Sequence, residues 1–149
     1  MITYLDTSII LPQLMPTHAN HARAKALVER LSLDGTVATT TLHTYGELYN
    51  NLTRASRQNQ YLLPEIAELA IAGLSRVMQI VELSKEDYVA AVHRCATLQM
   101  GGPIIYDAVH YEAALKVGAT TLYTENLRDF TRLPLPNDPP LKILGPTQK

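Results

Sequence analysis

Residues Ile2-Thr3-Tyr4-Leu5-Asp6-Thr7-Ser8 open the chain with a short β-prone, apolar run that stops at an acid. This run predicts a buried strand over residues 2–5, with Asp6 at its carboxyl end. A pattern rich in Ala, Leu, Arg and Lys predicts a helix from about Ala19 to Leu31, with a loop before it. Strand, loop and helix form the first unit of an alternating chain.

The alternation of strands and helices continues to the end of the sequence. Further strands are predicted at 36–41, 77–83, 119–123 and 141–144, and helices at 45–55, 64–76, after Ser84, and at 104–117. Ser84 and Asp87 have the spacing of a capping box, and Gly118 is a helix cap. The sequence therefore predicts an α/β fold, a three-layer α/β/α sandwich with a mainly parallel central sheet.

Length and composition favour one ordinary globular domain over residues 1–149. Apolar residues make up 46% of the chain and charged residues 18%, which excludes disorder over most of its length. Apolar runs fall far short of the ~20 residues of a membrane span, and no basic segment with a cleavage site opens the chain. We expect a cytoplasmic protein without membrane contact. Cys95 is the only cysteine, which excludes an internal disulfide and a cysteine-rich zinc site.

The net charge of −1 counts weakly against a nucleic-acid binder, because such domains usually carry a basic excess. A site that concentrates carboxylates would lower the total charge, and basic residues can still cluster around it. Whether the chain can bind nucleic acid therefore depends on the local arrangement of its charges.

Three acids stand at positions that suit a shared site. Asp6 follows a buried-type strand, and the hydroxyls of Thr7 and Ser8 can hydrogen-bond it or a ligand, although Asp6 could equally be a helix N-cap. Glu47 lies in a predicted helix beside its buried face, where a solvated surface acid is the alternative. Asp107 is the only charged residue in an apolar run, so it needs either a cation or an arginine partner.

A hard divalent cation would satisfy all three acids, because Mg²⁺ prefers carboxylate oxygens and completes its octahedron with water. No histidine ligand is required, and the histidines show no spacing typical of zinc proteins. His110 lies one helical turn after Asp107 and could lie near the site, but we interpret it as structural.

Four stretches together resemble the PIN domain of VapC toxins in order and spacing. They are Tyr4-Leu5-Asp6-Thr7-Ser8, His43-Thr44-Tyr45-Gly46-Glu47-Leu48-Tyr49, Ile105-Tyr106-Asp107-Ala108 and Leu122-Tyr123-Thr124-Glu125-Asn126-Leu127-Arg128-Asp129-Phe130. The resemblance spans nearly the whole chain, with a Gly-Gly break before the third stretch. It implies a ribonuclease that is the toxin of a toxin–antitoxin pair.

The resemblance also implies which residues bind the metal. Asp6, Glu47 and Asp107 are the implied Mg²⁺-binding acids, with Mn²⁺ as a possible substitute, and Asp6 and Asp107 are the expected direct ligands. Many PIN domains carry a fourth acid where this chain has Asn126, which puts a second metal ion in doubt. Asn126 can still hold water or phosphate, and Asp129 could supply the missing charge.

Arginines near these acids are candidates for holding the RNA phosphates. Arg54 lies seven residues after Glu47 and so on nearly the same helix face; Arg57 and Arg128 are the other two candidates. Each could instead be a solvated surface residue.

Two other functions fit parts of the sequence. A phosphatase of the haloacid dehalogenase kind also has an Asp after its first strand, but it needs a second Asp where this chain has Ser8. A PIN-like binding module without catalysis is the other alternative, and the three intact acids argue against it.

The expected partners are the RNA substrate, a small cognate antitoxin and a second copy of the chain. The resemblance implies the antitoxin, and its tail would place a basic residue among the acids. The predicted helix 64–76 and the residues before it carry more apolar side chains than one core face needs, which predicts a dimer patch. These residues are Leu62, Leu63, Ile66, Leu69, Ala70 and Leu74.

Overall fold

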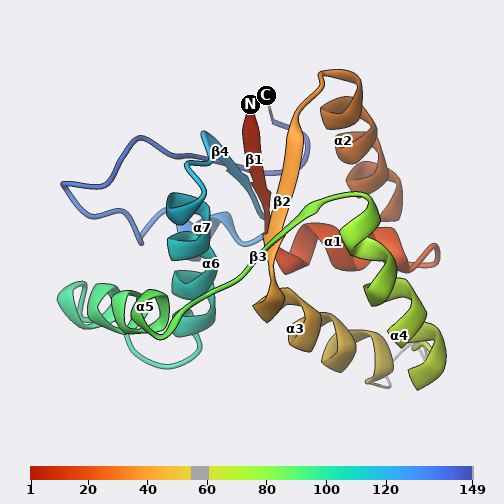
Figure 1. Cartoon of the computed structure of the whole chain (residues 1–149), viewed down its shortest axis with the longest axis horizontal. Helices are drawn as coiled ribbons and strands as arrows, with labels where there is room; N and C mark the ends of the chain where they lie inside the picture. The colour runs from red at the N-terminus through yellow and green to blue at the C-terminus, as the bar shows by residue number, and fades with distance from the viewer. Residues whose placement is uncertain (55–60, 149) are drawn as a thin grey trace.

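The central feature of the fold is one five-stranded sheet. The computed structural model describes residues 1–54 and 61–148, and its strands lie in the order β3-β2-β1-β4-β5, all parallel (Figure 1). The strands are β1 (Ile2–Leu5), β2 (Val37–Thr41), β3 (Gln79–Val81), β4 (Thr121–Tyr123) and β5 (Lys142–Leu144). The prediction of a mainly parallel sheet is therefore confirmed.

Helices cover both faces of this sheet (Figure 1). One group is α1 (Thr7–Leu14), α2 (His21–Leu33), α3 (Leu42–Thr53), α4 (Pro64–Ala72) and the short 3₁₀ helix η1 (Gly73–Arg76). The other group is α5 (Lys85–Thr97), α6 (Ile104–Lys116) and α7 (Leu127–Phe130). The three-layer sandwich is confirmed.

The alternation of side chains along the strands produces a separate core on each face. Tyr4 and Leu122 pack with the α5–α7 group, whereas their neighbours Leu5 and Tyr123 pack with the α1–α4 group. Successive strand residues point to opposite faces, and both faces are covered, so side chains on both sides of β1 are buried, Thr3 among them.

The sequence prediction was wrong at two places near the site. Residues 7–14 form α1 rather than a loop, although Pro12 lies inside the helix and cannot donate to the carbonyl of Ser8. The helix ends two residues after this proline. The short helix α7 was not predicted either, and it brings Asp129 round toward the carboxyl ends of the strands.

The predicted helix 64–76 is divided into α4 and η1, while the capping box of Ser84 and Asp87 is present at the start of α5. Gly118 has a φ of 64°, as expected for a helix cap. The predicted end of the second helix, Ala55, lies outside the described residues. No helix in the described ranges is both long and apolar enough to cross a membrane.

The strand order places the site. From β1 the chain moves outward through β2 and β3, and it then returns to the other side of β1 with β4 and β5. The carboxyl ends of β1 and β4 thus form a switch point, where open α/β sheets bind ligands. Asp6 directly follows β1 at this point.

Candidate metal centre

Asp6 is held at the end of β1 by hydroxyl groups. Its carboxylate is 5% exposed, and Oδ2 accepts hydrogen bonds from Ser8 Oγ at 2.6 Å and Thr124 Oγ1 at 2.8 Å. Asp6 occupies the N-cap position of α1, but its side chain makes no capping hydrogen bond. The N-cap alternative therefore does not explain the carboxylate, which points into the space between β1 and β4.

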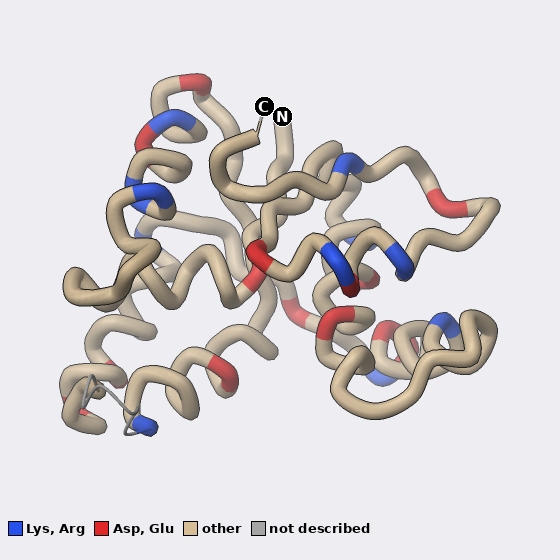
Figure 2. The backbone as a smooth tube through the Cα atoms, turned by 180° about the vertical axis from the view of Figure 1, so that it is seen from behind, with Lys and Arg blue, Asp and Glu red and all other residues tan. Residues whose placement is uncertain are grey.

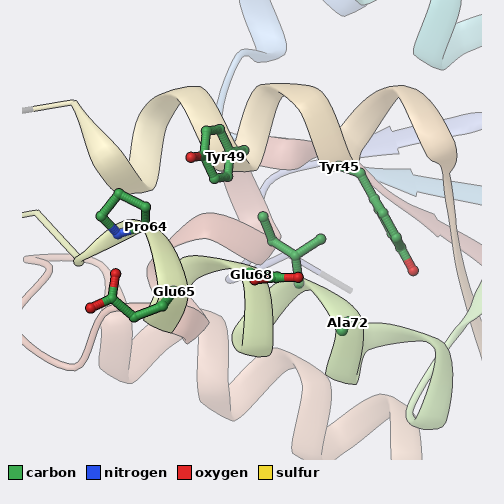
Figure 3. Close-up of a pocket in the computed structure, with 7 residues that line it drawn as sticks. Tyr45, Tyr49, Pro64, Glu65, Glu68 and Ala72 are labelled. Carbon is green, nitrogen blue, oxygen red and sulfur yellow. The ribbon is translucent and has the colours of Figure 1, made fainter.

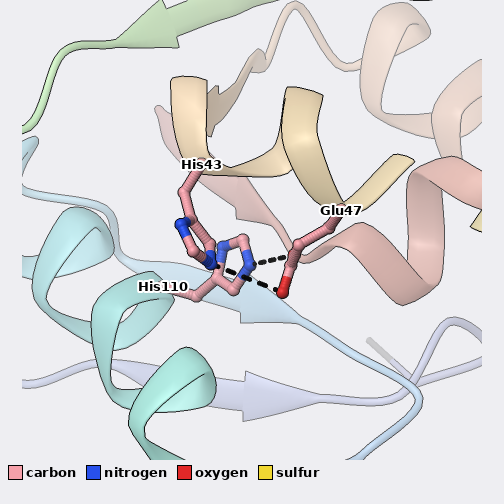
Figure 4. A group of neighbouring side chains, drawn as sticks. All are labelled: His43, Glu47 and His110. Atoms are coloured by element: carbon pink, nitrogen blue, oxygen red, sulfur yellow. Dashed lines mark hydrogen bonds and ion pairs between the residues drawn. The ribbon is translucent and has the colours of Figure 1, made fainter. Parts of the chain in front are cut away.

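Glu47 reaches the same region from the other side of β1. Its helix, α3, begins directly after β2, and Oε2 accepts hydrogen bonds from Thr7 Oγ1 and from His110 Nε2, the latter at 2.8 Å. The imidazole of His43 lies one turn earlier on α3, with Nε2 3.5 Å from Oε1 of Glu47 (Figure 4). Glu47 is therefore engaged on both carboxylate oxygens and is not a freely solvated acid.

His110 connects the helices and the strand that carry the acids. Its Nε2 donates to Glu47 on α3, and its Nδ1 lies 2.8 Å from the hydroxyl of Tyr4 on β1. Both His110 and Tyr4 are almost fully buried, and His110 itself is one turn after Asp107 on α6. These hydrogen bonds through His110 fix the relative positions of the three elements that contribute Asp6, Glu47 and Asp107.

Asp107 and Asp129 meet at the amide of Asn126. The Nδ2 group of Asn126 donates to Asp107 Oδ2 at 3.1 Å and to Asp129 Oδ2 at 3.0 Å. Asn126 follows Thr124, whose hydroxyl accepts a hydrogen bond from the Asn126 backbone N–H at 2.9 Å. One polar connection after β4 thus contacts both Asp6 and Asp107.

The acids differ in how readily they ionise. Burial, together with the charges of Asp6 and Asp129, raises the pKa of Asp107 to about 7. Burial alone would also raise the pKa of Glu47, but the hydrogen bond from His110 and the nearby imidazole of His43 outweigh it and hold that pKa well below its usual range. Burial would lower the pKa of His110, but the hydrogen bond to Glu47 raises it above the usual value. Among these acids, Asp107 is therefore the one whose pKa is raised by repulsion from the other carboxylates.

The donor set fits a hard divalent cation. Within the described ranges, no Lys or Arg nitrogen lies within 4.0 Å of the carboxylates of Asp6 or Asp107, so the arginine partner considered for Asp107 is not found there. Carboxylate oxygens of Asp6 and Asp107 face one region together with the amide of Asn126. Mg²⁺ prefers one or two such oxygens and water. The role of these residues as metal ligands remains a prediction.

The two hydroxyls expected to bind substrate are used inside the cluster. Thr7 donates to Glu47 and Ser8 donates to Asp6, while Ser8 also accepts the backbone N–H of Glu125 at 3.0 Å. Both hydroxyls were predicted to bind either the acids or a ligand, and in the structure both bind the acids.

The arginine candidates have different outcomes. Arg54 is the C-cap residue of α3, which ends at Thr53, and its backbone N–H still bonds the carbonyl of Asn50. Arg128 is exposed on α7 beside the Asn126 connection, and within the described ranges it makes no salt bridge. Arg57 lies outside the described residues. Phosphate binding by Arg54 and Arg128 stays a prediction.

Three contributors to the site were not among the predicted site residues: Thr124, His43 and His110. Thr124 lay in a stretch that carries the resemblance, and the i, i+3 spacing of Asp107 and His110 was visible. The spacing of four residues between His43 and Glu47 was also a usable signal, because both side chains then share a helix face.

Charge is distributed unevenly over the fold. Figure 2 shows acidic positions around the middle of the molecule and also on several outer helices and connections, where most of the basic positions lie. Two basic residues pair with acids near the site: Arg23 with Glu125 at 2.8 Å and Arg132 with Asp129 at 3.5 Å. Basic side chains next to these acids make a net charge near zero compatible with a phosphate ligand.

A separate groove of about 610 Å³ lies between α3 and α4. Tyr45 and Tyr49 stand on one side of it, and Glu65 and Glu68 on the other (Figure 3). Pro64, Ile71 and Ala72 complete its lining, which makes the groove largely apolar with an acidic margin. Such a groove suits a peptide with apolar and basic side chains.

These observations define a class of protein: an open parallel α/β domain with a cluster of acids at its switch point. The PIN domain family matches residues 3–135, and the chain belongs to this family. The haloacid dehalogenase alternative is thereby excluded. Among curated proteins, no sequence matches the chain.

Solved structures share the fold at low identity. The Mycobacterium tuberculosis VapC20 toxin, which cleaves the sarcin-ricin loop, is 21% identical with a TM-score of 0.68, over 92% of this chain and 99% of that one. VapBC-1 from nontypeable Haemophilus influenzae is 23% identical with a TM-score of 0.68, over 99% and 100%. DNA-bound VapBC from Salmonella typhimurium is 20% identical with a TM-score of 0.68, over 98% of each chain.

Proposed function

We propose that the chain is a magnesium-dependent endoribonuclease and the toxin of a type II toxin–antitoxin system. The observation that carries this proposal is the convergence of Asp6, Glu47 and Asp107 at the switch point of a PIN domain, with no Lys or Arg within salt-bridge distance of Asp6 or Asp107 in the described ranges. The VapC20 neighbour, an RNA-cleaving toxin of the same fold, supports the substrate class.

The metal, when bound, would lower the pKa of a water molecule and offset negative charge on the phosphate. Asp6 and Asp107 would hold Mg²⁺, with Mn²⁺ as a possible substitute, since both ions accept carboxylate oxygens. The hydroxyls of Ser8 and Thr124 keep the Asp6 carboxylate oriented, which leaves Oδ1 without a hydroxyl donor. Oδ1 of Asp6 is therefore the carboxylate oxygen that would bind the ion.

Glu47 is suited to orient the attacking water. Its carboxylate is held ionised by His110 and His43, so it can accept a hydrogen bond from water at neutral pH. Thr7 further limits rotation of the carboxylate. The Tyr4–His110 contact anchors this arrangement to β1.

Asn126, Asp129 and Arg128 would act on the other side of the phosphate. Asn126 already donates to Asp107 and Asp129, and together they occupy the position where many PIN domains carry a fourth acid. Arg128 is exposed on α7 and can approach a phosphate of the RNA from solvent. The RNA would then lie across the carboxyl ends of the strands.

A small antitoxin is the proposed protein partner. VapBC assemblies share the fold of this chain, which supports an antitoxin here. A basic residue of the antitoxin could satisfy Asp6 and Asp107 when metal is absent, and the groove between α3 and α4 offers an apolar surface for a neighbouring segment. Such a pair would act in the cytoplasm, where its RNA substrate is found.

A second copy of the chain is the other proposed partner. Leu63, Ile66 and Leu69 are 47–70% exposed around α4 and form a candidate apolar patch. Leu74 is buried and Leu62 packs against the α1–α4 core, so these two residues of the predicted set serve the core. The proposed C₂ patch consists of the exposed remainder.

Cleavage of RNA by the purified chain tests the proposal. Wild type should cut RNA in Mg²⁺ and not in chelator, and Asp6→Asn and Asp107→Asn should both abolish cleavage while retaining the helical circular dichroism spectrum. Glu29→Gln is a matched control, because Glu29 is an exposed acid on α2. A folded wild type that cuts no RNA in Mg²⁺ or Mn²⁺ would favour the binding-module alternative instead.

A further inference from the structure

Two histidines and one glutamate form a second cluster of metal-binding atoms. The ligand atoms of His43, Glu47 and His110 all lie within 4.8 Å of one another (Figure 4). Nε2 of His43 is 3.5 Å from Oε1 of Glu47, and Nε2 of His110 is 2.8 Å from Oε2. Ligands about 2.0–2.1 Å from a tetrahedral zinc ion lie roughly 3.3 Å apart. The two histidine–glutamate distances lie close to this value, and no pair of ligand atoms is more than 4.8 Å apart.

Tyrosine hydroxyls orient both imidazoles toward Glu47. Nδ1 of His110 lies 2.8 Å from the hydroxyl of Tyr4, and Nδ1 of His43 lies 3.3 Å from the hydroxyl of Tyr88. Each Nε2 therefore faces the same carboxylate. Metal-binding histidines almost always donate their other ring N–H to an oxygen, which fixes the tautomer and the direction of the ring. Both histidines of this cluster have such an oxygen in place.

One ring nitrogen of the cluster has no hydrogen-bond partner within the described residues. Nε2 of His43 is buried and makes no hydrogen bond with acceptable geometry, although it lies near Glu47. A buried ring nitrogen without a protein partner is costly. A bound cation would accept its lone pair.

Two of the three residues of the cluster also line a hollow at the surface, whereas His110 is buried behind them. His43 and Glu47 line a hollow of about 420 Å³ together with Gly46, Asn50, Asn51 and Tyr106. The ring of Tyr106 stacks on His43, with centroids 5.7 Å apart and an angle of 19°. The stacked ring holds His43 at the wall of the hollow, and water in the hollow could complete the coordination.

We propose that His43, Glu47 and His110 form a site for a divalent transition-metal ion of the zinc class, beside the carboxylate cluster and sharing Glu47 with it. Imidazole nitrogens suit Zn²⁺, whereas Mg²⁺ prefers oxygen, so the two sites select different ions. Three protein ligands with one open position are typical of an accessible zinc site. The proposal does not depend on RNA cleavage.

Titration with Zn²⁺ and with Co²⁺, whose visible absorption reports coordination, tests this site. His43→Ala should weaken the binding of both ions by more than about 100-fold, since it removes a ligand rather than a supporting residue. Tyr88→Phe should weaken binding by about 10-fold, because it removes only the group that orients His43. His93→Ala, which changes an exposed histidine of α5, should leave binding unchanged.

Asp107→Asn separates this site from the proposed magnesium site. The variant should keep the Co²⁺ spectrum and the Zn²⁺ affinity, even though it is expected to lose the response to Mg²⁺. Equal Zn²⁺ affinity in wild type and His43→Ala, or a Co²⁺ spectrum that disappears in Asp107→Asn while it persists in His43→Ala, would overturn the proposal. Circular dichroism of each variant confirms that the comparison is made between folded chains.

Discussion

The amide nitrogen of Asn126 lies 3.1 Å from Oδ2 of Asp107, and the same nitrogen lies 3.0 Å from Oδ2 of Asp129. A neutral amide thus separates two carboxylates that would otherwise repel each other more strongly. An acid at position 126 would have no hydrogen to donate to either neighbour. Asn126 stands where many PIN domains carry an acid, and it therefore reduces the negative charge of the metal-free cluster.

Asn126→Asp should lower the melting temperature in chelator and increase the rise produced by Mg²⁺. The added carboxylate repels Asp107 and Asp129 without metal and attracts the cation when it is present. Thermal scans of both proteins, with chelator and with millimolar Mg²⁺, measure the two effects. Asn137→Asp, in the exposed connection before β5, serves as the control. A variant more stable than wild type in chelator would refute this account of Asn126.

The pH dependence of stability without metal should carry the signature of Asp107. Its folded-state pKa of about 7 exceeds its ordinary value of 3.8, so between these values the folded chain holds a proton that the unfolded chain has released. Stability then falls as pH rises through this window. Asp107→Asn removes the effect, so in chelator its stability relative to wild type should increase from pH 5 to pH 8.

Urea unfolding of both proteins at several pH values measures this difference. The contribution of Glu47, whose pKa is lowered, is fully present above its ordinary pKa of 4.5 and is lost only at lower pH, below the range of pH 5 to pH 8. The contribution of His110, whose pKa is raised, is lost as pH rises through its folded value, in both proteins, and largely cancels in the difference. If the difference in unfolding free energy between the two proteins does not change with pH, the pKa of Asp107 is not raised in the folded chain.

A buried ion network between α5, α6 and the connection before β5 should be sensitive to the loss of its cation. Arg94 is 3% exposed and bonds Glu112 at 2.8 Å and Asp138 at 2.6 Å. Arg94→Met leaves both acids without a cation and should cost about 3–5 kcal/mol. Lys25→Ala, which breaks an exposed pair with Glu29 on α2, should cost at most about 1 kcal/mol. Equal losses of unfolding free energy in Arg94→Met and Lys25→Ala, measured with urea, would contradict this role of Arg94.

Self-association should depend on the exposed patch of α4. Leu69→Lys places a charge on a side chain that is 70% exposed, so the monomer fold should be retained while a dimer that uses the patch is broken. Sedimentation should report a dimer for wild type and a monomer for the variant. Leu33→Lys, at an exposed position at the end of α2, is the matched control and should remain dimeric. A wild type that is monomeric at micromolar concentration would refute the dimer.

Much of the fold followed from local patterns in the sequence. The run before Asp6 and the run before α3 both became strands that are buried at their carboxyl ends, because both are rich in β-branched or apolar side chains, which favour strands. Helix α1 was missed because Pro12 breaks the usual helical signal, and the eight-residue helix is stabilised by burial of Ile9 and Ile10 instead.

The candidate site was only partly predictable for a different reason. The strand-end position of Asp6 and the apolar surroundings of Asp107 are local features, which a sequence displays. The contact of His110 with Tyr4 and Glu47 joins residues 106 and 63 positions apart, and no spacing rule reports such a contact. The end of α3 at Thr53, two residues before the predicted end, also could not be located to a single residue.

The most direct test of the central claim, that Asp107 and its neighbours hold the magnesium ion, is a thermal scan of wild type and Asp107→Asn at neutral pH, with chelator and with saturating Mg²⁺. At 100 times the dissociation constant the ion should stabilise wild type by about 2.7 kcal/mol, because it binds the folded chain only. Asp107→Asn should lose most of this increment, and Glu29→Gln should retain it. Equal increments in wild type and Asp107→Asn would mean that the ion binds elsewhere, and they would contradict the proposed metal centre.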